Sequence, residues 1–478
     1  MNNSCEILDN DNFIVFGAAL SGMAAARLLR SMGKTVAVYD EAPPEMLESR
    51  RDELVKIGVP LLTELDYDAF PYFTLDDGHG ESIPSMWDVM VLSPGIPTNH
   101  DLVATAVERG CVVRSEIEIG YHACPVPLIG ITGTNGKTTV THLVSHILLT
   151  AGIAAPIAGN VGRPLSDVVS DPILRAPKAL VVCEVSSYQL ETIEYFSPKV
   201  ACVTNITPDH LDRYVTMDNY VEAKRWITAN QKDYDFLVLN GDDGLCLSFG
   251  PRSRAKVRTF STRHEVEAGA WLSDEYLYLN MPDMDEAVGV MKRDEIPLPG
   301  IHNVENVLAA MTICACLEVA PGKIAEAVRT FQAVPHRIEK VCTIDGVDYF
   351  NDSKATNLDS MSKALVSFDR PIILIAGGRD KGSPWTKLNE VVKERVKGLV
   401  MIGEATPIGM KAWGEIVPNA KTAESMQHAV EQAKEMAETG DVILLSPGCA
   451  SFDMYKNFEE RGDDFKKIAQ SIAKREIA

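Results

Sequence analysis

The chain has no uninterrupted apolar run approaching the ~20 residues that a membrane-spanning helix needs. Its first residues, MNNSCEILDNDNF, lack the basic stretch and apolar core of a secretion signal. We therefore expect a cytoplasmic protein with no membrane partner. None of its 10 cysteines forms a C-x-x-C pair, and CAC at Cys314 to Cys316 lacks the usual zinc-ligand spacing. Reduced, mostly buried thiols are expected.

Basic residues are in deficit, because 46 Lys and Arg stand against 67 Asp and Glu, a formal charge of -21. That charge repels nucleic acid and anionic lipid at long range, so no nucleic-acid partner is expected. Any anionic ligand must be bound by a local basic or metal-lined site. A chain of 478 residues is too long for one core and predicts about three domains. We expect it to act as a monomer.

Short apolar runs alternate with helical patterns along the chain. The runs are FIVFG, TVAVYD, VMVLSPG, VPLIGITG, LVVCEVSS, VACVTNIT, FLVLNG, PIILIAGG, GLVMIG and DVILLSPG. Runs that are apolar throughout and end in Gly, Ser, Asp or Asn predict parallel sheets covered on both faces by helices. Ligands of such sheets bind beyond the carboxyl ends of the strands.

Two seams divide this series of strands. One falls at RSEIEIGYHACPVP and the other at FQAVPHRIE, which follows a helical pattern beginning at HNVENVLAAM. We therefore predict three α/β domains, over residues 1–115, 116–333 and 334–478.

The segment ITGTNGKTTV, Ile131 to Val140, joins a predicted strand to a predicted helix that ends before Gly152. Strand, glycine turn and helix N-terminus follow in the order that a phosphate site requires. The helix dipole supplies only about 1 kcal/mol, so Lys137 and Mg²⁺ bound through Thr138 or Thr139 must supply the rest. The alternative is an ordinary turn with an exposed lysine. The first glycine of the common P-loop is replaced by Ile131, which argues against a common GTPase or ATPase switch.

A second glycine turn, GAALSG, covers Gly17 to Gly22. Ala19 stands where a dinucleotide fold has its middle glycine, which weakens a nicotinamide interpretation. Asp40 closes the next strand at a spacing that suits a ribose. The residues alone leave open NAD, another ligand or a purely structural turn.

Other polar residues have both a functional and an ordinary interpretation. Glu184 ends the strand ALVVCEV, where a carboxylate often meets Mg²⁺, although a lone Glu is more often solvated or paired. His210 follows the next strand, and a lone His is usually structural because imidazole is not a preferred Mg²⁺ ligand. Lys224, in YVEAKRW, is interpreted as an exposed lysine on a helix, without a role. Asn303 is a possible helix cap, and Arg337 a possible surface charge.

The pattern GTNGKTT and nine further motifs resemble the Mur ligase superfamily, which joins amino acids to carboxylates in bacterial cell-wall precursors and to folates. The further motifs are AGNVGRPL, EVSSYQLE, NITPDHLDRY, YVEAK, LPGIHNVENVLAA, PHRIE, NDSKATN, GGRDKG and LLSPGCASFDMYKNFEERGDDF. The resemblance implies an α/β fold of three domains, each a largely parallel sheet flanked by helices. It implies a P-loop-like central ATPase domain between Rossmann-like N- and C-terminal domains.

The last motif is most similar to the D-glutamate-adding branch of the superfamily. That similarity implies an ATP-dependent, ADP-forming ligase that joins D-glutamate to UDP-N-acetylmuramoyl-L-alanine through an acyl phosphate, in peptidoglycan synthesis. It implies two Mg²⁺ sites and a Lys224 converted by CO2 into a carbamate. The implied catalytic residues are Lys137, Glu184, His210 and Lys224, and the implied metal ligands are Thr138, Glu184, His210 and carbamylated Lys224.

The resemblance also implies three binding sets. ATP would be bound by Gly133, Thr134, Asn135, Gly136, Lys137, Thr138, Thr139, Asn303, Asn306, His336, Arg337 and Asp352. The UDP precursor would be bound by Leu20, Ser21, Asp40, Ser93, Pro94, Gly95 and Asn160. D-glutamate would be bound by Thr356, Lys381, Ser451 and Phe458. Ala19 and Ala42 depart from residues common in the family, which leaves the diphosphate contacts undefined.

Three rival functions stay open from the sequence. A folylpolyglutamate synthase would lack the SPGCASFD block and a UDP site. A nicotinamide-dependent oxidoreductase built on GAALSG would leave the Lys137 loop and Glu184 unexplained. An ATP-driven switch would make no bond.

Overall fold

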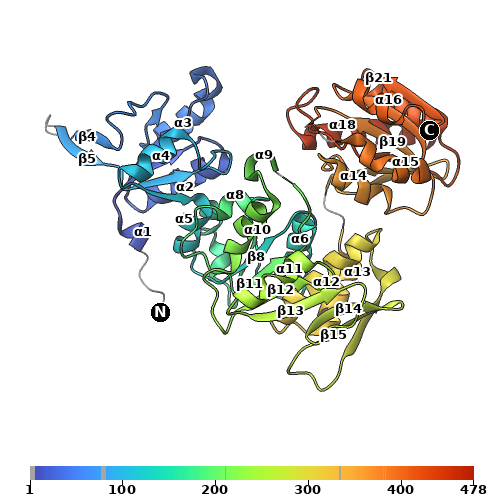
Figure 1. The fold of residues 1–478 in the computed structure, drawn as a ribbon, viewed down its shortest axis with the longest axis horizontal. Helices are drawn as coiled ribbons and strands as arrows, with labels where there is room; N and C mark the ends of the chain where they lie inside the picture. Colours follow the sequence, from blue (N-terminus) through green and yellow to red (C-terminus); the bar gives the residue numbers. More distant parts are fainter. Residues whose placement is uncertain are drawn as a thin grey trace. The chain divides into compact units, whose positions relative to one another are not determined.

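A computed structural model describes residues 6–76, 82–209, 211–332, 335–380, 382 and 384–477 (Figure 1). Contacts divide the chain into two compact units. Unit 1 comprises Met1–Met291 and Val307–Ala327, and unit 2 comprises Lys292–Asn306 and Val328–Ala478. Two of the predicted site residues, His210 and Lys381, lie outside the described residues.

Unit 1 begins with a parallel sheet in the order β3-β2-β1-β6-β7. Its strands are β1 (Asn12–Phe16), β2 (Thr35–Tyr39), β3 (Leu61–Leu62), β6 (Val89–Leu92) and β7 (Val112–Ser115). Phe13 and Val15 pack in one core cluster with α2 (Leu20–Ser31), while Ile14 and Phe16 lie in a second cluster with α4 (Asp101–Glu108). The sheet is therefore covered on both faces, as its apolar runs predict. A hairpin of β4 (Tyr72–Asp76) and β5 (Ser82–Met86) is separate from this sheet.

The second sheet has the order β16-β15-β14-β13-β12-β11-β8-β10-β9. Its strands are β8 (Leu128–Thr132), β9 (Ile157–Gly159), β10 (Val181–Glu184), β11 (Val200–Val203), β12 (Phe236–Asn240), β13 (Lys256–Ser261), β14 (Gly269–Ser273), β15 (Tyr276–Asn280) and β16 (Val288–Lys292). Strands β8 to β14 pair in parallel, and β14 pairs antiparallel with β15. That hairpin is not among the runs quoted from the sequence, and its second strand, β15, alternates buried residues with exposed or partly exposed ones.

Helices follow most strands of the second sheet. They are α6 (Lys137–Thr150), α7 (Leu165–Val168), α8 (Ser187–Leu190), α9 (Leu211–Tyr214), α10 (Met217–Arg225), α11 (Gly244–Leu247), α12 (Ile301–Ala315) and α13 (Pro321–Thr330). Helix α5 (Glu116–Ala123) lies between β7 of the first sheet and β8 of the second. Helix α6 confirms the helix predicted after the glycine loop. The carboxyl ends of β8 and β10 are adjacent, because Glu184 pairs with Ile131.

Unit 2 contains a third sheet in the order β17-β18-β22-β19-β20-β21. Its strands are β17 (Glu339–Ile344), β18 (Val347–Asn351), β19 (Ile372–Gly377), β20 (Val396–Ile402), β21 (Asn419–Ala423) and β22 (Val442–Leu445). All pairs are parallel except β17 with β18. Residues of α14 (Leu358–Leu365), α15 (Asn389–Arg395) and α16 (Thr406–Trp413) share one core cluster, and residues of α17 (Met426–Met436) and α18 (Phe458–Ile477) share another.

The predicted α/β fold class is confirmed, and every apolar run quoted from the sequence contains a strand. The domain boundaries at residues 115 and 333 stay predictions. In the part of the chain that the structure describes, no helix is both long and apolar enough to cross a membrane. The nine described cysteines are free thiols, and most are buried.

Candidate active site

The predicted phosphate loop, Gly133 to Gly136, joins β8 to α6. Gly136 is the N-cap of α6 and has a φ of 82°. Gly133 has a φ of 140°, and a Cβ there would lie 2.0 Å from Thr204 Oγ1. Both positions therefore need glycine, one for its conformation and the other for conformation and space. The close approach of the loop to the end of β11 explains why the loop has a glycine at position 133.

Residues after β11 hold this loop in place. Asn205 Oδ1 accepts the Asn135 amide at 2.9 Å. Asn205 Nδ2 and Thr204 Oγ1 donate to the Asn135 carbonyl at 3.0 and 2.6 Å. The loop is thus braced in a fixed shape, which lowers the cost of ordering it around a ligand. Sequence reasoning assigned no role to Thr204 or Asn205, because a brace is defined by contacts across the sheet.

Two lysines converge on the carbonyl of Gly133. Lys137 Nζ donates to it at 2.9 Å and also to the Thr134 carbonyl at 2.9 Å. Lys224 Nζ donates to the same Gly133 oxygen at 2.8 Å. Burial, together with the charge of Lys137, lowers the pKa of Lys224 well below its ordinary value. The arrangement places the charge of Lys137, with the amine of Lys224 beside it, where an anion would bind.

The expectation that Lys224 is exposed is wrong. Its relative exposure is 2%, because α10 packs against α8 and places the amine 4.6 Å from the Tyr220 ring centre. The Tyr220 hydroxyl lies 3.2 Å from Thr134 Oγ1, so the helix bearing Lys224 also contacts the phosphate loop. Helical periodicity places the lysine on a face of α10 without showing which partner covers that face.

Glu184 lies at the carboxyl end of β10 and is 2% exposed. Its Oε1 accepts a hydrogen bond from Asn160 Nδ2 at 2.8 Å, whereas its Oε2 is buried and has no hydrogen-bond partner among the described residues. A buried carboxylate oxygen without a donor is costly, and a bound cation would satisfy it. Thr138, also buried, supplies a hydroxyl at the start of α6. This donor chemistry fits a hard, oxygen-preferring cation such as Mg²⁺.

The described residues include no cluster of three or more His, Cys, Asp or Glu side chains suited to a metal. A metal site at Glu184 would therefore take other ligands as well, such as hydroxyls, phosphate oxygens or a modified lysine. Asn160, predicted to bind the precursor, instead has its side-chain amide on Glu184. A residue predicted to bind the precursor thus contacts a residue predicted to bind the metal.

The predicted precursor residues of the first sheet gather around the turn after β1. Ser93 Oγ donates to the Gly17 carbonyl at 2.7 Å, and Asp40 accepts the amides of Ala18 and Ala42 at 2.6 and 2.8 Å. These polar side chains thus shape the turn itself. Leu20 is 78% exposed at the start of α2. Ser21 and Pro94 are half-buried, and Gly95 is exposed.

In unit 2, Asp352 follows β18 and is fully buried. Ser446 Oγ donates to it at 2.9 Å, and Arg337 Nη1 lies 3.9 Å from its other oxygen. Burial raises the pKa of Asp352 to about 6, although the Arg337 charge opposes that shift. The structure therefore brings together these two predicted nucleotide residues at the carboxyl end of the third sheet.

His336 packs against α18 and is 7% exposed. Its backbone has a φ of 64°, its amide donates to Glu339 Oε2 at 2.8 Å, and its Nδ1 accepts from Asn351 Nδ2 at 3.0 Å. A Cβ on Gly462 would lie 2.1 Å from His336 Nδ1, so the ring needs a glycine beneath it. Burial lowers the pKa of His336. These contacts make His336 a fixed anchor for the start of the third sheet.

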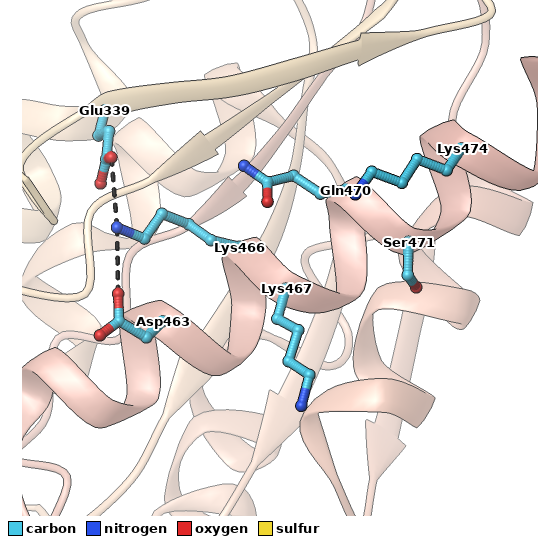
Figure 2. A pocket seen from close by; sticks show the side chains of 7 residues that line it. All are labelled: Glu339, Asp463, Lys466, Lys467, Gln470, Ser471 and Lys474. Carbon is cyan, nitrogen blue, oxygen red and sulfur yellow. Dashed lines mark hydrogen bonds and ion pairs between the residues drawn. The ribbon is translucent and has the colours of Figure 1, made fainter.

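A cavity of about 460 Å³ lies along α18 and β17 (Figure 2). Figure 2 shows Lys466 turned toward Glu339 and Asp463, at 3.4 and 3.1 Å from their nearest oxygens. The cavity is also lined by Lys467, Gln470, Ser471 and Lys474. None of the predicted site residues lines it. Its two carboxylates neutralise much of the lysine charge, so we assign it no ligand.

Three of the four predicted D-glutamate residues are described: Phe458 begins α18, Ser451 lies between β22 and α18, and Thr356 lies between β18 and α14. Ser451 is buried, Thr356 and Phe458 are half-buried, and the Phe458 ring lies 6.1 Å from that of His336.

Sequence reasoning missed Arg461, which is 2% exposed and holds this region together. Its guanidinium donates to the carbonyls of Ser353, Cys449 and Ala450 at 2.8, 3.1 and 3.3 Å. Burial lowers the pKa of Arg461 to about 10. A charged residue in the run EERGDDF is ordinarily a surface residue, so nothing in the sequence distinguished it.

Asn303 and Asn306 are both buried near the start of α12. Asn303 Nδ2 donates to the Pro299 carbonyl at 2.6 Å, and Asn306 Nδ2 donates to Asn303 Oδ1 at 3.1 Å. The alternative of a helix cap at Asn303 is wrong, because α12 begins at Ile301. The pair forms one hydrogen-bonded unit on the helix.

Comparisons with known proteins agree along the length of the chain. The Mur ligase middle domain matches residues 131–314, and the Mur ligase, glutamate ligase domain matches residues 336–449. The chain is 41% identical to UDP-N-acetylmuramoylalanine--D-glutamate ligase of Pelotomaculum thermopropionicum, over 96% of this chain and 98% of that protein. The enzyme of the same name from Salinibacter ruber is 42% identical, over 96% and 97%.

Two solved structures share the fold at low identity. A pseudomurein peptide ligase type C from Methanothermus fervidus has a TM-score of 0.57 and 19% identity, over 97% of this chain and 100% of that one. UDP-N-acetylmuramate-alanine ligase from Thermotoga maritima has a TM-score of 0.58 and 17% identity, with the same coverage of 97% and 100%.

Proposed function

The chain belongs to the Mur ligase family, and from that premise we propose that it is an ATP-dependent ligase that adds D-glutamate to UDP-N-acetylmuramoyl-L-alanine. The reaction forms ADP and phosphate and supplies a precursor of peptidoglycan. The protein acts as a monomer in the cytoplasm. The observation that carries the chemistry is the pair of lysine amines on the Gly133 carbonyl, together with the Glu184 oxygen on the neighbouring strand that no described residue hydrogen-bonds.

The reaction proceeds in two steps on the substrates. The alanine carboxylate of the precursor attacks the γ-phosphorus of ATP, which forms an acyl phosphate and releases ADP. The amine of D-glutamate then attacks the acyl carbon, and the tetrahedral intermediate expels phosphate to leave an amide. No side chain acts as a nucleophile, so catalysis depends on positioning and on cationic stabilisation.

The phosphate loop and Lys137 hold the triphosphate. The loop is already braced by Asn205, and the amides at the start of α6 face its ligand. Lys137 exchanges its two loop carbonyls for phosphate oxygens when the nucleotide binds. The further ATP-binding residues of this proposal are Asn303, Asn306, His336, Arg337 and Asp352.

Lys224 is carbamylated in the active enzyme. Burial favours its neutral amine, the form whose nitrogen attacks CO2 and loses a proton. The product is an anion in place of a cation. Thr138, Glu184, His210 and the carbamate would hold two Mg²⁺ ions, which supply charge neutralisation between the triphosphate and the attacked carboxylate when bound.

The two remaining substrates have separate sets of residues. The precursor is bound by Leu20, Ser21, Asp40, Ser93, Pro94, Gly95 and Asn160. D-glutamate is bound by Thr356, Lys381, Ser451 and Phe458. A dicarboxylate needs a cation and several hydroxyl or amide donors, and Lys381 with two hydroxyl residues meets that need.

A phosphate-release assay tests the proposal. Purified chain with Mg²⁺ and ATP is expected to release phosphate only when both the precursor and D-glutamate are present, with the amide product detected by mass spectrometry. Phosphate release that needs neither substrate would indicate an ATP-driven switch. Activity with a folate and glutamate would indicate a folylpolyglutamate synthase. Hydride transfer from a nicotinamide, without phosphate release, would indicate an oxidoreductase.

A further inference from the structure

The Glu191 carboxylate, directly after α8, accepts hydrogen bonds from two separate segments of unit 1. Its Oε2 accepts from Arg213 Nη2 at 2.6 Å and from Thr98 Oγ1 at 3.2 Å. Its Oε1 accepts from Tyr214 Oη at 2.5 Å. Thr98 belongs to the loop between β6 and α4, which also carries Ser93 to Gly95, and the other two donors belong to α9. One carboxylate therefore ties the first sheet to the second.

The contacts continue from Tyr214 to the phosphate loop. The Tyr214 ring lies 5.4 Å from the Tyr220 ring, and Tyr220 Oη lies 3.2 Å from Thr134 Oγ1. On the other side, the Tyr214 ring stacks at 6.0 Å on Tyr188, whose face also receives the Arg213 guanidinium at 4.1 Å. Glu191 thus holds Tyr214, the middle ring of three, and the ring on one side of it, Tyr220, contacts the phosphate loop.

The energetics of this network favour a defined geometry. The Glu191 side chain is 13% exposed and that of Arg213 is 19% exposed, so water competes weakly for their ion pair. Hydrogen bonds between charged groups in such surroundings are shorter and stronger than neutral ones. If Glu191 loses its charge, Arg213 keeps its own charge without the partner. The stack then loses the contact that sets the position of α9.

We infer that Glu191 is a positioning residue that couples the loop of residues 93–98 to the phosphate loop. This inference rests on the proposed function, in which the first loop binds the UDP precursor and the second binds ATP. Binding of the precursor orders the loop at Thr98, and the network passes that order to Thr134 through Glu191 and the tyrosines. Thermodynamic linkage requires the effect to be reciprocal, so ATP strengthens precursor binding by the same factor.

Calorimetry on the full chain tests the coupling. The dissociation constant of a non-hydrolysable ATP analogue is measured with and without the UDP precursor, for the wild type, E191Q and T98V. We expect the precursor to tighten analogue binding about tenfold in the wild type, within the usual range of such couplings, and about twofold or less in both variants. The Michaelis constant for the precursor is expected to rise about tenfold in E191Q, while that for D-glutamate changes less than twofold.

A matched control separates coupling from loss of a cross-sheet link. Arg27 on α2 forms an ion pair with Asp167 on α7 at 2.8 Å, which also joins the two sheets but contacts neither loop. R27Q is therefore expected to keep the tenfold coupling of the wild type. A loss of coupling in R27Q equal to that in E191Q would overturn the inference.

The remaining outcomes distinguish a failure of the Glu191 inference from a failure of the proposed ligase function. A wild-type chain that binds no precursor contradicts the proposed function. The role of Glu191 is contradicted if the wild type makes the amide but shows no coupling between precursor and ATP analogue. It is also contradicted if E191Q and T98V both keep the coupling of the wild type. Thermal unfolding checks that E191Q folds, and if it does not, T98V decides, because it removes one hydroxyl from an exposed residue.

Discussion

Unit 1 contains two strand-to-helix turns of similar construction. They differ in the groups that donate hydrogen bonds to the carbonyl of their first residue. The turn after β8 starts with Gly133 at a φ of 140°, and the turn after β1 starts with Gly17 at a φ of 100°. The Gly133 carbonyl accepts from two lysine amines, whereas the Gly17 carbonyl accepts from the Ser93 hydroxyl. The first residue of the following helix is Lys137 in one and Leu20 in the other.

On the proposed assignment of ligands, one backbone arrangement serves two kinds of ligand. Both turns offer helix amides to a ligand, but the helix dipole alone is worth only about 1 kcal/mol. In a chain of net charge -21, the turn with lysines suits a triphosphate. The turn with a neutral brace and an exposed leucine suits the uracil and ribose end of a nucleotide. Ala42 fits that division, because an alanine side chain cannot neutralise a diphosphate.

The largest expected effect comes from removing the charge of the first turn. K137M is expected to lower kcat/KM for ATP by about 10³ or more, because the γ-phosphate loses its main protein cation. Phosphate release under saturating precursor and D-glutamate measures it. K56M, which removes an exposed lysine from α3 (Glu48–Lys56), is the matched control and is expected to match the wild type. Equal losses in both variants would contradict the assignment.

The second lysine has a distinct signature. K224A is expected to lower kcat by about 10², since the carbamate no longer balances the cations of the site. Millimolar formate or acetate is expected to restore part of that activity by occupying the vacated space as a carboxylate. K137M serves as the control, because a carboxylate cannot replace a cation and no rescue is expected there. Full activity of K224A without added carboxylate would exclude carbamylation.

The leucine of the second turn is tested by L20A. Leu20 is 78% exposed, so covering it with a uracil base would recover part of its transfer free energy. The Michaelis constant for the precursor is expected to rise about tenfold, with that for ATP unchanged. V55A, at a 67% exposed valine on α3, is expected to change neither constant. A rise for both substrates would show that the two turns are not separate sites.

A smaller effect is expected from the neutral brace. S93A leaves the Gly17 carbonyl without its hydroxyl donor in a buried position. The expected loss of stability is about 1–3 kcal/mol, the usual cost of an unsatisfied buried group. Thermal and urea unfolding measure it. An unchanged midpoint would show that water or another donor replaces the hydroxyl.

The smallest signal is a pH dependence of stability. Burial and Lys137 lower the pKa of Lys224, whereas a lysine in the unfolded chain titrates near 10.4. Between those values, with Lys224 as the free amine, the unfolded chain binds one more proton than the folded chain, so the stability of the uncarbamylated wild type falls as the pH falls below about 10. K224M removes this dependence. Its stability relative to the wild type is therefore expected to increase from pH 10 toward pH 7 in thermal unfolding, and a constant difference would contradict the shift.

The local features of the fold were predictable because they depend on neighbouring residues. Strands such as β8 and β10 are buried on both faces, so they form short apolar runs in the sequence. Each run ends where the chain leaves the strand. Helix α6 shows its apolar period directly after the glycine loop. The order of strand, loop and helix then placed Lys137 at a helix start and Glu184 at a strand end. The antiparallel pair β14 and β15 escaped prediction because its partly exposed strands do not form such runs.

The sequence by itself determined the strand and helix succession, the two glycine turns and the identity of the charged groups, because these follow from periodicity and spacing along the chain. Only the tertiary structure decided that Lys224 is buried on the Gly133 carbonyl, that Arg461 holds three backbone carbonyls, and that Glu191 joins two sheets. Each of those facts depends on a partner distant in sequence. Whether a residue is buried or paired depends on its partner as well as on the residue itself. Periodicity and spacing along the chain do not show which distant groups come into contact.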